Sequence, residues 1–224
     1  MHPKNPRLRE RPVKLRTLVR SRTLSADFYD DTLFRGYMKN NNLEEILNRK
    51  DIPADTKAAI QSKFQQLEFL ALHDSMTGLY NRNYYDNEIT KLEKDRAEYP
   101  VTAIILDIDN LKQINDKYEH GAGDLVIKNV GEAIKHNFRE TDLVARIGGD
   151  EFAVVLPKVE KYDAVENKIK KIEQEITKYE INTNLKLSIS VGTATGSNKQ
   201  ITNVIKQADS RMYENKRAHK QANP

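Results

Sequence analysis

The sequence of 224 residues contains no cysteine. This absence excludes a disulfide framework and a thiol nucleophile, and it fits a reducing compartment. No apolar run approaches the roughly 18 residues that cross a bilayer. No hydrophobic segment follows the basic N-terminal residues, as a signal peptide would require. We therefore expect a soluble, cytoplasmic protein with no transmembrane segment.

The excess of positive charge is confined to the start of the chain. The sequence has 37 Lys and Arg against 33 Asp and Glu, and eight of these basic residues but only one acid lie in residues 1–22. The remaining 202 residues hold 29 basic and 32 acidic side chains, so the body is slightly acidic and no specific nucleic-acid binding is expected. Residues 1–22 are predicted to be a disordered basic arm, able to contact anionic lipid, nucleic acid or an acidic partner.

Two glycines followed by two carboxylates stand between two short apolar segments. Residues 142–146 and 152–156 are predicted strands, and the glycines at 148–149 predict a tight hairpin turn, because glycine adopts positive φ without steric cost. Glycine also lets a phosphate-bearing ligand approach the backbone, and Asp150 and Glu151 are hard oxygen ligands suited to Mg²⁺. An isolated tetrapeptide of this kind is more often a solvated turn, so the rest of the chain decides its meaning.

Another carboxylate follows an apolar, β-branched run. Residues 101–106 predict a strand buried on both faces, and Asp107 comes directly after them. Ligand chemistry in α/β sheets commonly lies at the carboxyl ends of strands. Taken alone, Asp107 is equally well explained as a strand end that meets water.

Six segments in order resemble the GGDEF family, the diguanylate cyclases that join two GTP molecules into cyclic di-GMP. The resemblance covers residues from about 70 to 220, with Met76 and Leu111 where Leu and Phe are commoner. Six ordered segments are a strong signal, whereas the GGDE tetrapeptide alone would be weak. The matching segments are residues 74–82 (DxLTGLxNR), 107–112 (DxDxFK), 115–116 (ND), 120–124 (HxxGD), 148–152 (GGDEF) and 209–216 (similar to DxALYxAK).

The order of predicted elements agrees with this resemblance. Strands that alternate with helices predict an α/β sandwich (α+β). The resemblance implies a βααββαβ core, in which helices flank a central, mainly antiparallel sheet similar to the palm of nucleotide cyclases. The expected domains are the arm at 1–22, a helical extension with a stalk helix at 23–73, and the GGDEF catalytic domain at 74–224. The predicted helices are 53–73, 81–98, 124–138, 163–179 and 201–219, with a short helix after 107, and the predicted strands are 101–107, 142–146, 152–156 and 185–192.

The stalk helix carries a short heptad-like stripe of Ile60, Phe64, Leu67 and Ala71. Two heptads do not hold a coiled coil alone, and packing of this helix on its own domain is equally compatible with the pattern. GGDEF domains commonly follow a helical stalk that pairs, so the resemblance favours a homodimer.

The resemblance implies a metal-dependent phosphoryl transfer in which each GTP 3′-hydroxyl attacks the α-phosphate of the other GTP. Two Mg²⁺ (or Mn²⁺) ions are expected on the carboxylates of Asp107 and Asp150 and the carbonyl of Ile108. Asp150 and Glu151 are both candidates for assisting deprotonation of the hydroxyl, and the sequence does not divide that role between them. Lys112 is expected to meet phosphate charge in the transition state.

Guanine recognition is expected from Asn115 and Asp124, with His120 lining the same pocket. A carboxylate accepts from the guanine N1–H and amine groups, which adenine lacks. A serine replaces this Asp in some relatives that make mixed cyclic dinucleotides, so Asp124 favours GTP.

Phosphate contacts are expected from Gly148, Gly149, and the lysines at 216 and 220. The backbone N–H groups of residues 109–111 are expected to form an anion-binding nest. Lys216 matches the family pattern, but Lys220 stands where Arg is commoner and His219 where Gly is commoner.

Arg139 and Asp142 have the spacing of the family's inhibitory RxxD motif, which binds the product. The alternative is an ordinary i,i+3 surface ion pair. Two other functions stay open: a catalytically inactive receptor for cyclic di-GMP or GTP, and a nucleic-acid-binding protein that acts through residues 1–22.

Overall fold

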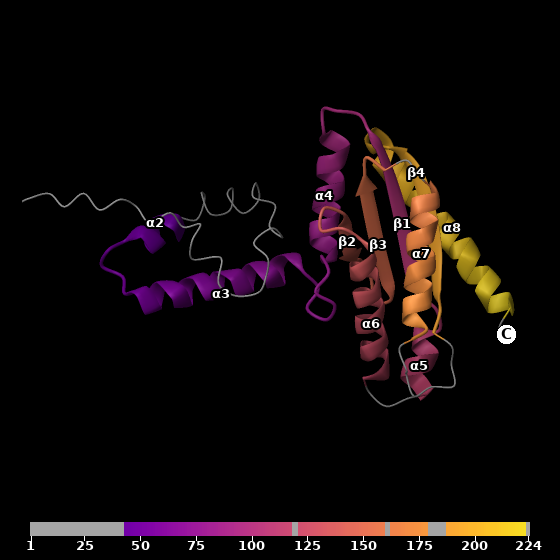
Figure 1. Cartoon of the computed structure of the whole chain (residues 1–224), viewed down its shortest axis with the longest axis horizontal. Helices are drawn as coiled ribbons and strands as arrows, with labels where there is room; N and C mark the ends of the chain where they lie inside the picture. Colours follow the sequence, from indigo (N-terminus) through magenta and orange to yellow (C-terminus); the bar gives the residue numbers. More distant parts are fainter. Residues whose placement is uncertain (1–42, 118–120, 160–161, 179–186, 223–224) are drawn as a thin grey trace, which may run out of the picture. The chain divides into compact units, whose positions relative to one another are not determined.

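The computed structural model describes residues 43–117, 121–159, 162–178 and 187–222 (Figure 1). The predictions for the basic arm, for residues 23–42 and for His120 lie outside these ranges. Contacts divide the chain into two units, Met1–Ile60 and Gln61–Pro224. The domain boundary expected between residues 73 and 74 stays a prediction.

The described part of the chain begins with two helices. Helix α2 spans Leu43–Asn48, and α3 spans Ala54–Leu72, within which the division between the two units falls. The predicted helix at 53–73 is therefore confirmed. None of the α3 side chains is buried, and Leu67 and Leu70 expose 56% and 53% of their surface.

The second unit has the predicted element order. From β1 to β4 the chain runs βααββαβ, with α4 before this core and α8 after it (Figure 1). The elements are α4 (Arg82–Lys94), β1 (Pro100–Ile108), α5 (Leu111–Lys117), α6 (Ala122–Asn137), β2 (Leu143–Arg146), β3 (Glu151–Pro157), α7 (Tyr162–Ile176), β4 (Ile189–Ser197), the 3₁₀ helix η3 (Asn198–Gln200) and α8 (Ile201–Ala222).

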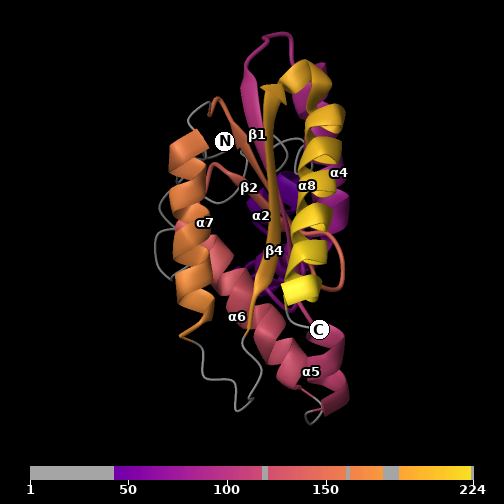
Figure 2. The same ribbon diagram turned by 90° about the vertical axis from the view of Figure 1, so that its right-hand side faces the viewer.

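The four strands form an antiparallel sheet in the order β2-β3-β1-β4. Helices cover both faces, with α6 and α7 on one face and α4 and α8 on the other (Figure 2). Each face has its own apolar core, so β1 is buried on both sides, as its continuous apolar sequence predicts. The central position of β1 places its carboxyl end between β3 and β4.

Strand β4 differs from the prediction of 185–192 at both ends. It begins at Ile189, after residues 187–188, which are not in a strand, and it continues to Ser197; residues 185–186 lie outside the described ranges. Its second half is made of small residues whose sequence has no apolar alternation. Helix α8 lies directly on this backbone: a Cβ at Gly192 would overlap the carbonyl of Ala208 and the backbone of Met212. A Cβ at Gly196 would lie 2.6 Å from Val204 Cγ2, so the close approach of α8 continues along the part of the strand that hydrophobic periodicity fails to predict.

Helix α4 ends at Lys94, four residues before the predicted end at 98. Asp95 leaves the helical conformation, and its carboxylate accepts from the Ala97 N–H at 3.2 Å and the Tyr99 hydroxyl at 3.1 Å. These local hydrogen bonds compete with another helical turn.

Among the helices in the described ranges, none has the length and apolar character that crossing a membrane requires.

Candidate active site

The candidate site begins with Asp107, which is 3% exposed near the carboxyl end of β1. Its neighbours in the ladder are Glu151 on β3 and Ser190 on β4. Helix α8 contributes Lys216, whose Nζ lies 2.6 Å from each carboxylate oxygen of Asp107 and donates to Oδ2. The other oxygen, Oδ1, is buried and receives no hydrogen bond.

Burial raises the pKa of Asp107 above its ordinary value, and the charges of Asp150 and Glu151 raise it further. The Lys216 ammonium opposes this effect through its hydrogen bond and its charge, without cancelling it. For Lys216, burial lowers the pKa, but the contact with Asp107 and the other carboxylates leaves it raised. The site thus concentrates negative charge that one ammonium only partly balances.

The turn between β2 and β3 holds the two hairpin carboxylates beside β1. The N–H groups of Ile147 and Gly148 donate to the Glu151 carbonyl at 2.9 and 3.2 Å. The Ile108 N–H donates to the Asp150 carbonyl at 3.0 Å, which fastens the turn to the end of β1. Asp150 therefore follows the hairpin turn at the same end of the sheet as Asp107.

The structural reason for the two glycines differs from the prediction. Among the described residues, the glycines with positive φ are Gly78 and Gly121, so the expectation of positive φ in the hairpin is wrong. A Cβ at Gly148 would lie 2.6 Å from Glu151 Oε2, so this glycine makes room for the Glu151 side chain. A Cβ at Gly149 would meet nothing within 4 Å, and Gly149 is exposed, which leaves its backbone approachable.

The oxygen atoms of this corner suit a hard divalent cation. The buried Oδ1 of Asp107 lacks a hydrogen bond, and the carboxylates of Asp150 and Glu151 raise the local negative charge. Within the described ranges, no group of three or more His, Cys, Asp or Glu side chains has a metal-binding arrangement. A cation here would therefore need main-chain oxygen, water or ligand phosphate in addition to the side chains.

The residues expected to recognise guanine lie together on α5 and α6. A Cβ at Gly123 would overlap the side-chain amide of Asn115, so Asn115 packs against the first turn of α6, next to Asp124. Asn115, Asp124 and Lys112 are exposed. The glycine of the HxxGD segment thus has a packing role that its position in the motif does not reveal.

The expected phosphate nest at residues 109–111 is reduced by one donor. The Asp109 N–H already donates to the Ser188 carbonyl at 3.0 Å, so it does not point to a ligand. Asn110 adopts a left-handed conformation with φ of 57°, which lets α5 begin directly afterwards. Lys220, expected to bind phosphate, is exposed on α8, four residues beyond Lys216.

The sequence analysis missed the side-chain network around Asp109, which is only 6% exposed. Its carboxylate accepts from the hydroxyls of Ser188 and Ser190 at 2.7 and 2.6 Å, and His219 Nδ1 lies 2.8 Å from Oδ2. Three partners from β4, its preceding loop and α8 therefore converge on one carboxylate. The only sequence signal was the unusual histidine at 219.

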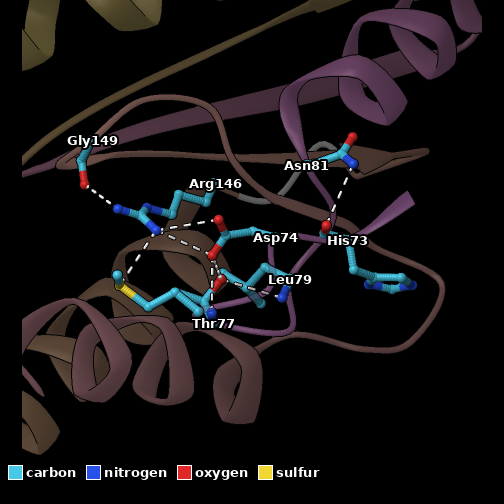
Figure 3. A network of polar contacts seen from close by, with 8 residues as sticks. His73, Asp74, Thr77, Leu79, Asn81, Arg146 and Gly149 are labelled. Atoms are coloured by element: carbon cyan, nitrogen blue, oxygen red, sulfur yellow. Dashed lines mark hydrogen bonds and ion pairs between the residues drawn. The ribbon is translucent and has the colours of Figure 1, made fainter. Parts of the chain in front are cut away.

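Arg146 was another missed residue, and it connects the hairpin to the loop before α4 (Figure 3). One guanidinium nitrogen lies 3.2 Å from both carboxylate oxygens of Asp74, and another donates to the Gly149 carbonyl at 2.7 Å. Burial tends to raise the pKa of Asp74, but hydrogen bonds from Thr77 and the charge of Arg146 outweigh it and leave the pKa lowered. The position of the glycine turn thus depends on the segment at 74–82.

The candidate inhibitory motif forms a turn of its own. Asp142 accepts a hydrogen bond from the Arg139 backbone N–H at 2.9 Å, and the Asp142 N–H donates to the Arg139 carbonyl at 3.0 Å. No ion pair joins these two described side chains, so the alternative of a surface ion pair is not what the structure contains. The Arg139 side chain is exposed, and Lys168 lies close enough for the charges of both residues to affect its pKa.

The family model of the diguanylate cyclase GGDEF domain matches residues 71–222. The chain therefore belongs to the GGDEF-domain family. It is 41% identical over 96 residues to the diguanylate cyclase DgcS of Shewanella oneidensis, covering 42% of this chain and 32% of that protein. It is 31% identical over 180 residues to the probable diguanylate cyclase DgcT of Escherichia coli, covering 77% of this chain and 39% of that protein.

A solved structure of the coiled coil and GGDEF domain of DgcB from Caulobacter crescentus, in complex with c-di-GMP, has the same fold. The TM-score is 0.65 at 27% sequence identity, and the match covers 80% of this chain and 96% of that chain. The chain spans about a third to two fifths of the length of the two curated relatives.

Proposed function

We propose that this protein is a diguanylate cyclase that condenses two GTP molecules into cyclic di-GMP and releases pyrophosphate. The observation that carries this proposal is the contact of Lys216 with the buried Asp107, beside the hairpin carboxylates Asp150 and Glu151. A partly balanced carboxylate cluster beside a glycine turn suits the binding of cations and phosphates.

The reaction forms a bond from each 3′-oxygen to the α-phosphorus of the other GTP. It breaks the bond from that phosphorus to the oxygen that bridges the α- and β-phosphates, and pyrophosphate leaves. The hydroxyl proton passes to Asp150 or Glu151, both of which lie at the hairpin near β1. Lys216, Lys220 and Lys112 neutralise phosphate charge, and the exposed Gly149 backbone allows the phosphates to approach.

Divalent metal ions, Mg²⁺ or Mn²⁺ and two for each site, would be held by Asp107, Asp150 and the Ile108 carbonyl. When bound, they would stabilise charge on the attacking and leaving oxygens. Asp107 Oδ1, which lies 2.6 Å from Lys216 Nζ but receives no hydrogen bond, and the nearby charges of Asp150 and Glu151 support a cation at this carboxylate.

Guanine would be recognised by Asn115 and Asp124, which the packing of Asn115 on Gly123 holds in one region. Bound adenine would leave the Asp124 carboxylate without the donors that guanine supplies, so GTP is favoured. His120 would line the same pocket.

We further propose that the product inhibits the enzyme at Arg139 and Asp142. The guanidinium of Arg139 is exposed and has no ion pair with Asp142, so it can fork onto a guanine edge or a phosphate. Product bound at this site would hold two domains in an arrangement that differs from the one that catalysis requires.

The active species is proposed to be a homodimer. The product has two halves, and one domain supplies one carboxylate cluster, so two domains must present each hydroxyl to the other domain's phosphate. No side chain of α3 is buried, and Leu67 of the heptad-like stripe exposes 56% of its surface, which supports pairing of two stalks. Specific activity should rise with protein concentration in the dilute range, and removal of residues 1–70 should shift this rise to higher concentration.

Incubation of the purified protein with GTP and Mg²⁺ tests the proposal, with mass spectrometry of the product and an EDTA control. Cyclic di-GMP and pyrophosphate are expected only when metal is present. A protein that binds cyclic di-GMP without making it would be a receptor. A salt-dependent DNA titration tests the remaining alternative, that the basic arm binds nucleic acid.

A further inference from the structure

The last turns of α8 are attached to the sheet by polar contacts. The final buried apolar side chain of this helix is Met212, which is 5% exposed, and none of the described side chains after it is buried. Lys216 and Lys220 both lie in this segment. The side chains that fix it therefore decide where the two phosphate-binding lysines stand.

Two of these contacts reach the same end of β1. Asp107 and Asp109 are two residues apart in an extended segment, and Lys216 and His219 are three residues apart on one helix face. Lys216 contacts Asp107, and His219 Nδ1 lies 2.8 Å from Asp109 Oδ2. The two contacts thus form one seam between α8 and the carboxyl end of β1.

The hydrogen-bond partners define the tautomer of His219. The Val191 N–H donates to Asn215 Oδ1 at 2.8 Å, so the other side-chain atom of Asn215 is the amide nitrogen, a donor. That nitrogen lies 3.4 Å from His219 Nε2, which must accept, and Nδ1 then carries the proton donated to Asp109. Ser190 Oγ, which donates to Asp109 Oδ1, also lies 3.2 Å from His219 Nδ1 and can accept from the same N–H, so these donor and acceptor roles are consistent.

Under the proposed function, nucleotide binding changes the contact of Lys216 with Asp107 but leaves the contact of His219 with Asp109 in place. Lys216 turns at least one of its three ammonium donors from Asp107 to a phosphate. Asp109 is held by two serine hydroxyls and its side chain is 5% exposed, so it has no such second role. The contact with His219 can therefore persist when the other one changes.

We propose that His219 is a positioning residue, which anchors the last turns of α8 to Asp109 and keeps Lys216 and Lys220 directed at the nucleotide phosphates. It acts through the helix and does not touch the substrate. This inference rests on the proposed function of the site, but the anchor itself is a property of the protein without nucleotide.

The test compares His219→Ala and His219→Asn with the wild-type protein. Alanine removes the donor while favouring helix more than histidine does, so loss of helix propensity would not explain its effect. Asparagine places an amide donor close to the position of Nδ1. Glu214→Ala, an exposed site on the same helix, is the matched control.

Binding of a GTP analogue with a methylene group between the α- and β-phosphorus atoms, measured by calorimetry with Mg²⁺, is the first readout. We expect His219→Ala to weaken binding by about fivefold or more and to raise KM for GTP similarly, with kcat changed less than about twofold. His219→Asn and Glu214→Ala should stay within about twofold of wild type. Equal affinities of wild type and His219→Ala would overturn the proposal.

Amide hydrogen exchange of residues 216–222 without nucleotide is the second readout. Faster exchange in His219→Ala, restored in His219→Asn, is expected. If the wild type makes no cyclic di-GMP but this exchange difference is present, the proposed function has failed and the anchor stands. If exchange is the same in all variants, the anchor is contradicted whatever the activity.

Discussion

Two carboxylates pair with cations on opposite sides of the glycine hairpin, and their environments are opposite. Asp74 pairs with Arg146, and its hydrogen bonds leave its pKa lowered. Asp107 pairs with Lys216, yet one of its oxygens receives no hydrogen bond, and its pKa is raised. The first carboxylate is fully used by the protein, whereas the second keeps bonding capacity for a ligand. We propose that the first ion pair is structural and that the second is functional.

The largest expected effect comes from substitutions in the carboxylate cluster of Asp107, Asp150 and Glu151. Asp107→Asn, Asp150→Ala and Glu151→Ala should each reduce cyclic di-GMP formation at least about a hundredfold, as expected for metal and proton-transfer groups. The free energy of unfolding should change little for Asp150→Ala and Glu151→Ala, because these residues contribute little apolar burial. For Asp107→Asn it should also change little, because removing a buried charge offsets the lost contact with Lys216. Initial rates and urea unfolding at pH 7 measure both quantities.

Glu93→Ala, an exposed acid on α4, is the control and should retain full activity. Retention of more than about a tenth of the wild-type rate at any of the three positions would remove that residue from the mechanism.

Asp74→Asn tests the ion pair of Asp74 with Arg146. Asparagine has nearly the same side-chain shape and keeps an oxygen that accepts from Thr77, but it lacks the charge that Arg146 contacts. We expect it to lower the free energy of unfolding by about 1–3 kcal/mol at pH 7. The folded pKa of Asp74 is lowered, so its stabilisation is present above the ordinary value of about 3.9 and is lost as the pH falls through the lower folded pKa.

Urea unfolding of Asp74→Asn and wild type at neutral and acidic pH measures this effect. The stability difference between the two proteins should shrink as the pH falls below about 3.9. A difference that stays constant to the lowest accessible pH would show that the charge of Asp74 is not responsible.

Sequence motifs predicted much of the fold and the cluster of site residues, but for some features they gave no physical cause. The apolar run before Asp107 identified β1, because burial on both faces requires it. The glycine at 148 was expected to provide positive φ, whereas it makes room for the Glu151 carboxylate. The space that Gly148 leaves for the side chain of Glu151, three residues later, is not visible in a pattern of residue types.

The contacts that the sequence analysis missed join residues far apart in the chain. Asp109 and His219 are 110 positions apart, and Asp74 and Arg146 are 72 apart. Neither pair follows a helical or strand period, so both depend on the assembled sheet. Strand β4 was misplaced for a related reason, because its small residues fit the close approach of α8 and carry no alternating pattern.

The next prediction concerns the exposed carboxylate of Asp124, which we propose binds guanine. Asp124→Ser should lower discrimination between GTP and ATP by about tenfold or more and permit some ATP incorporation, because the acceptor for guanine is lost. Glu132→Ser, an exposed acid on the same helix, should leave discrimination unchanged. Competition between the two nucleotides, with analysis of the mixed products, gives the ratio. Full GTP selectivity of Asp124→Ser would assign the guanine contact to another residue.

The smallest expected effect on the initial rate concerns Arg139. Wild-type turnover should slow as cyclic di-GMP accumulates, and Arg139→Ala should remove this slowing while the initial rate stays within about twofold. Arg96→Ala, another exposed arginine, should behave as wild type. Progress curves with and without added product measure the effect. Identical curves for wild type and Arg139→Ala would leave the turn at 139–142 without an inhibitory role.

The contrast between the two ion pairs is tested most directly by Mn²⁺ binding, followed by electron paramagnetic resonance in the presence of the methylene GTP analogue. The comparison uses wild type, Asp107→Asn and Asp74→Asn at a temperature where all three are folded. We predict at least about a tenfold loss of Mn²⁺ affinity for Asp107→Asn and wild-type affinity for Asp74→Asn. Wild-type Mn²⁺ affinity in Asp107→Asn would contradict the assignment of Asp107 as the carboxylate that the protein reserves for its ligand.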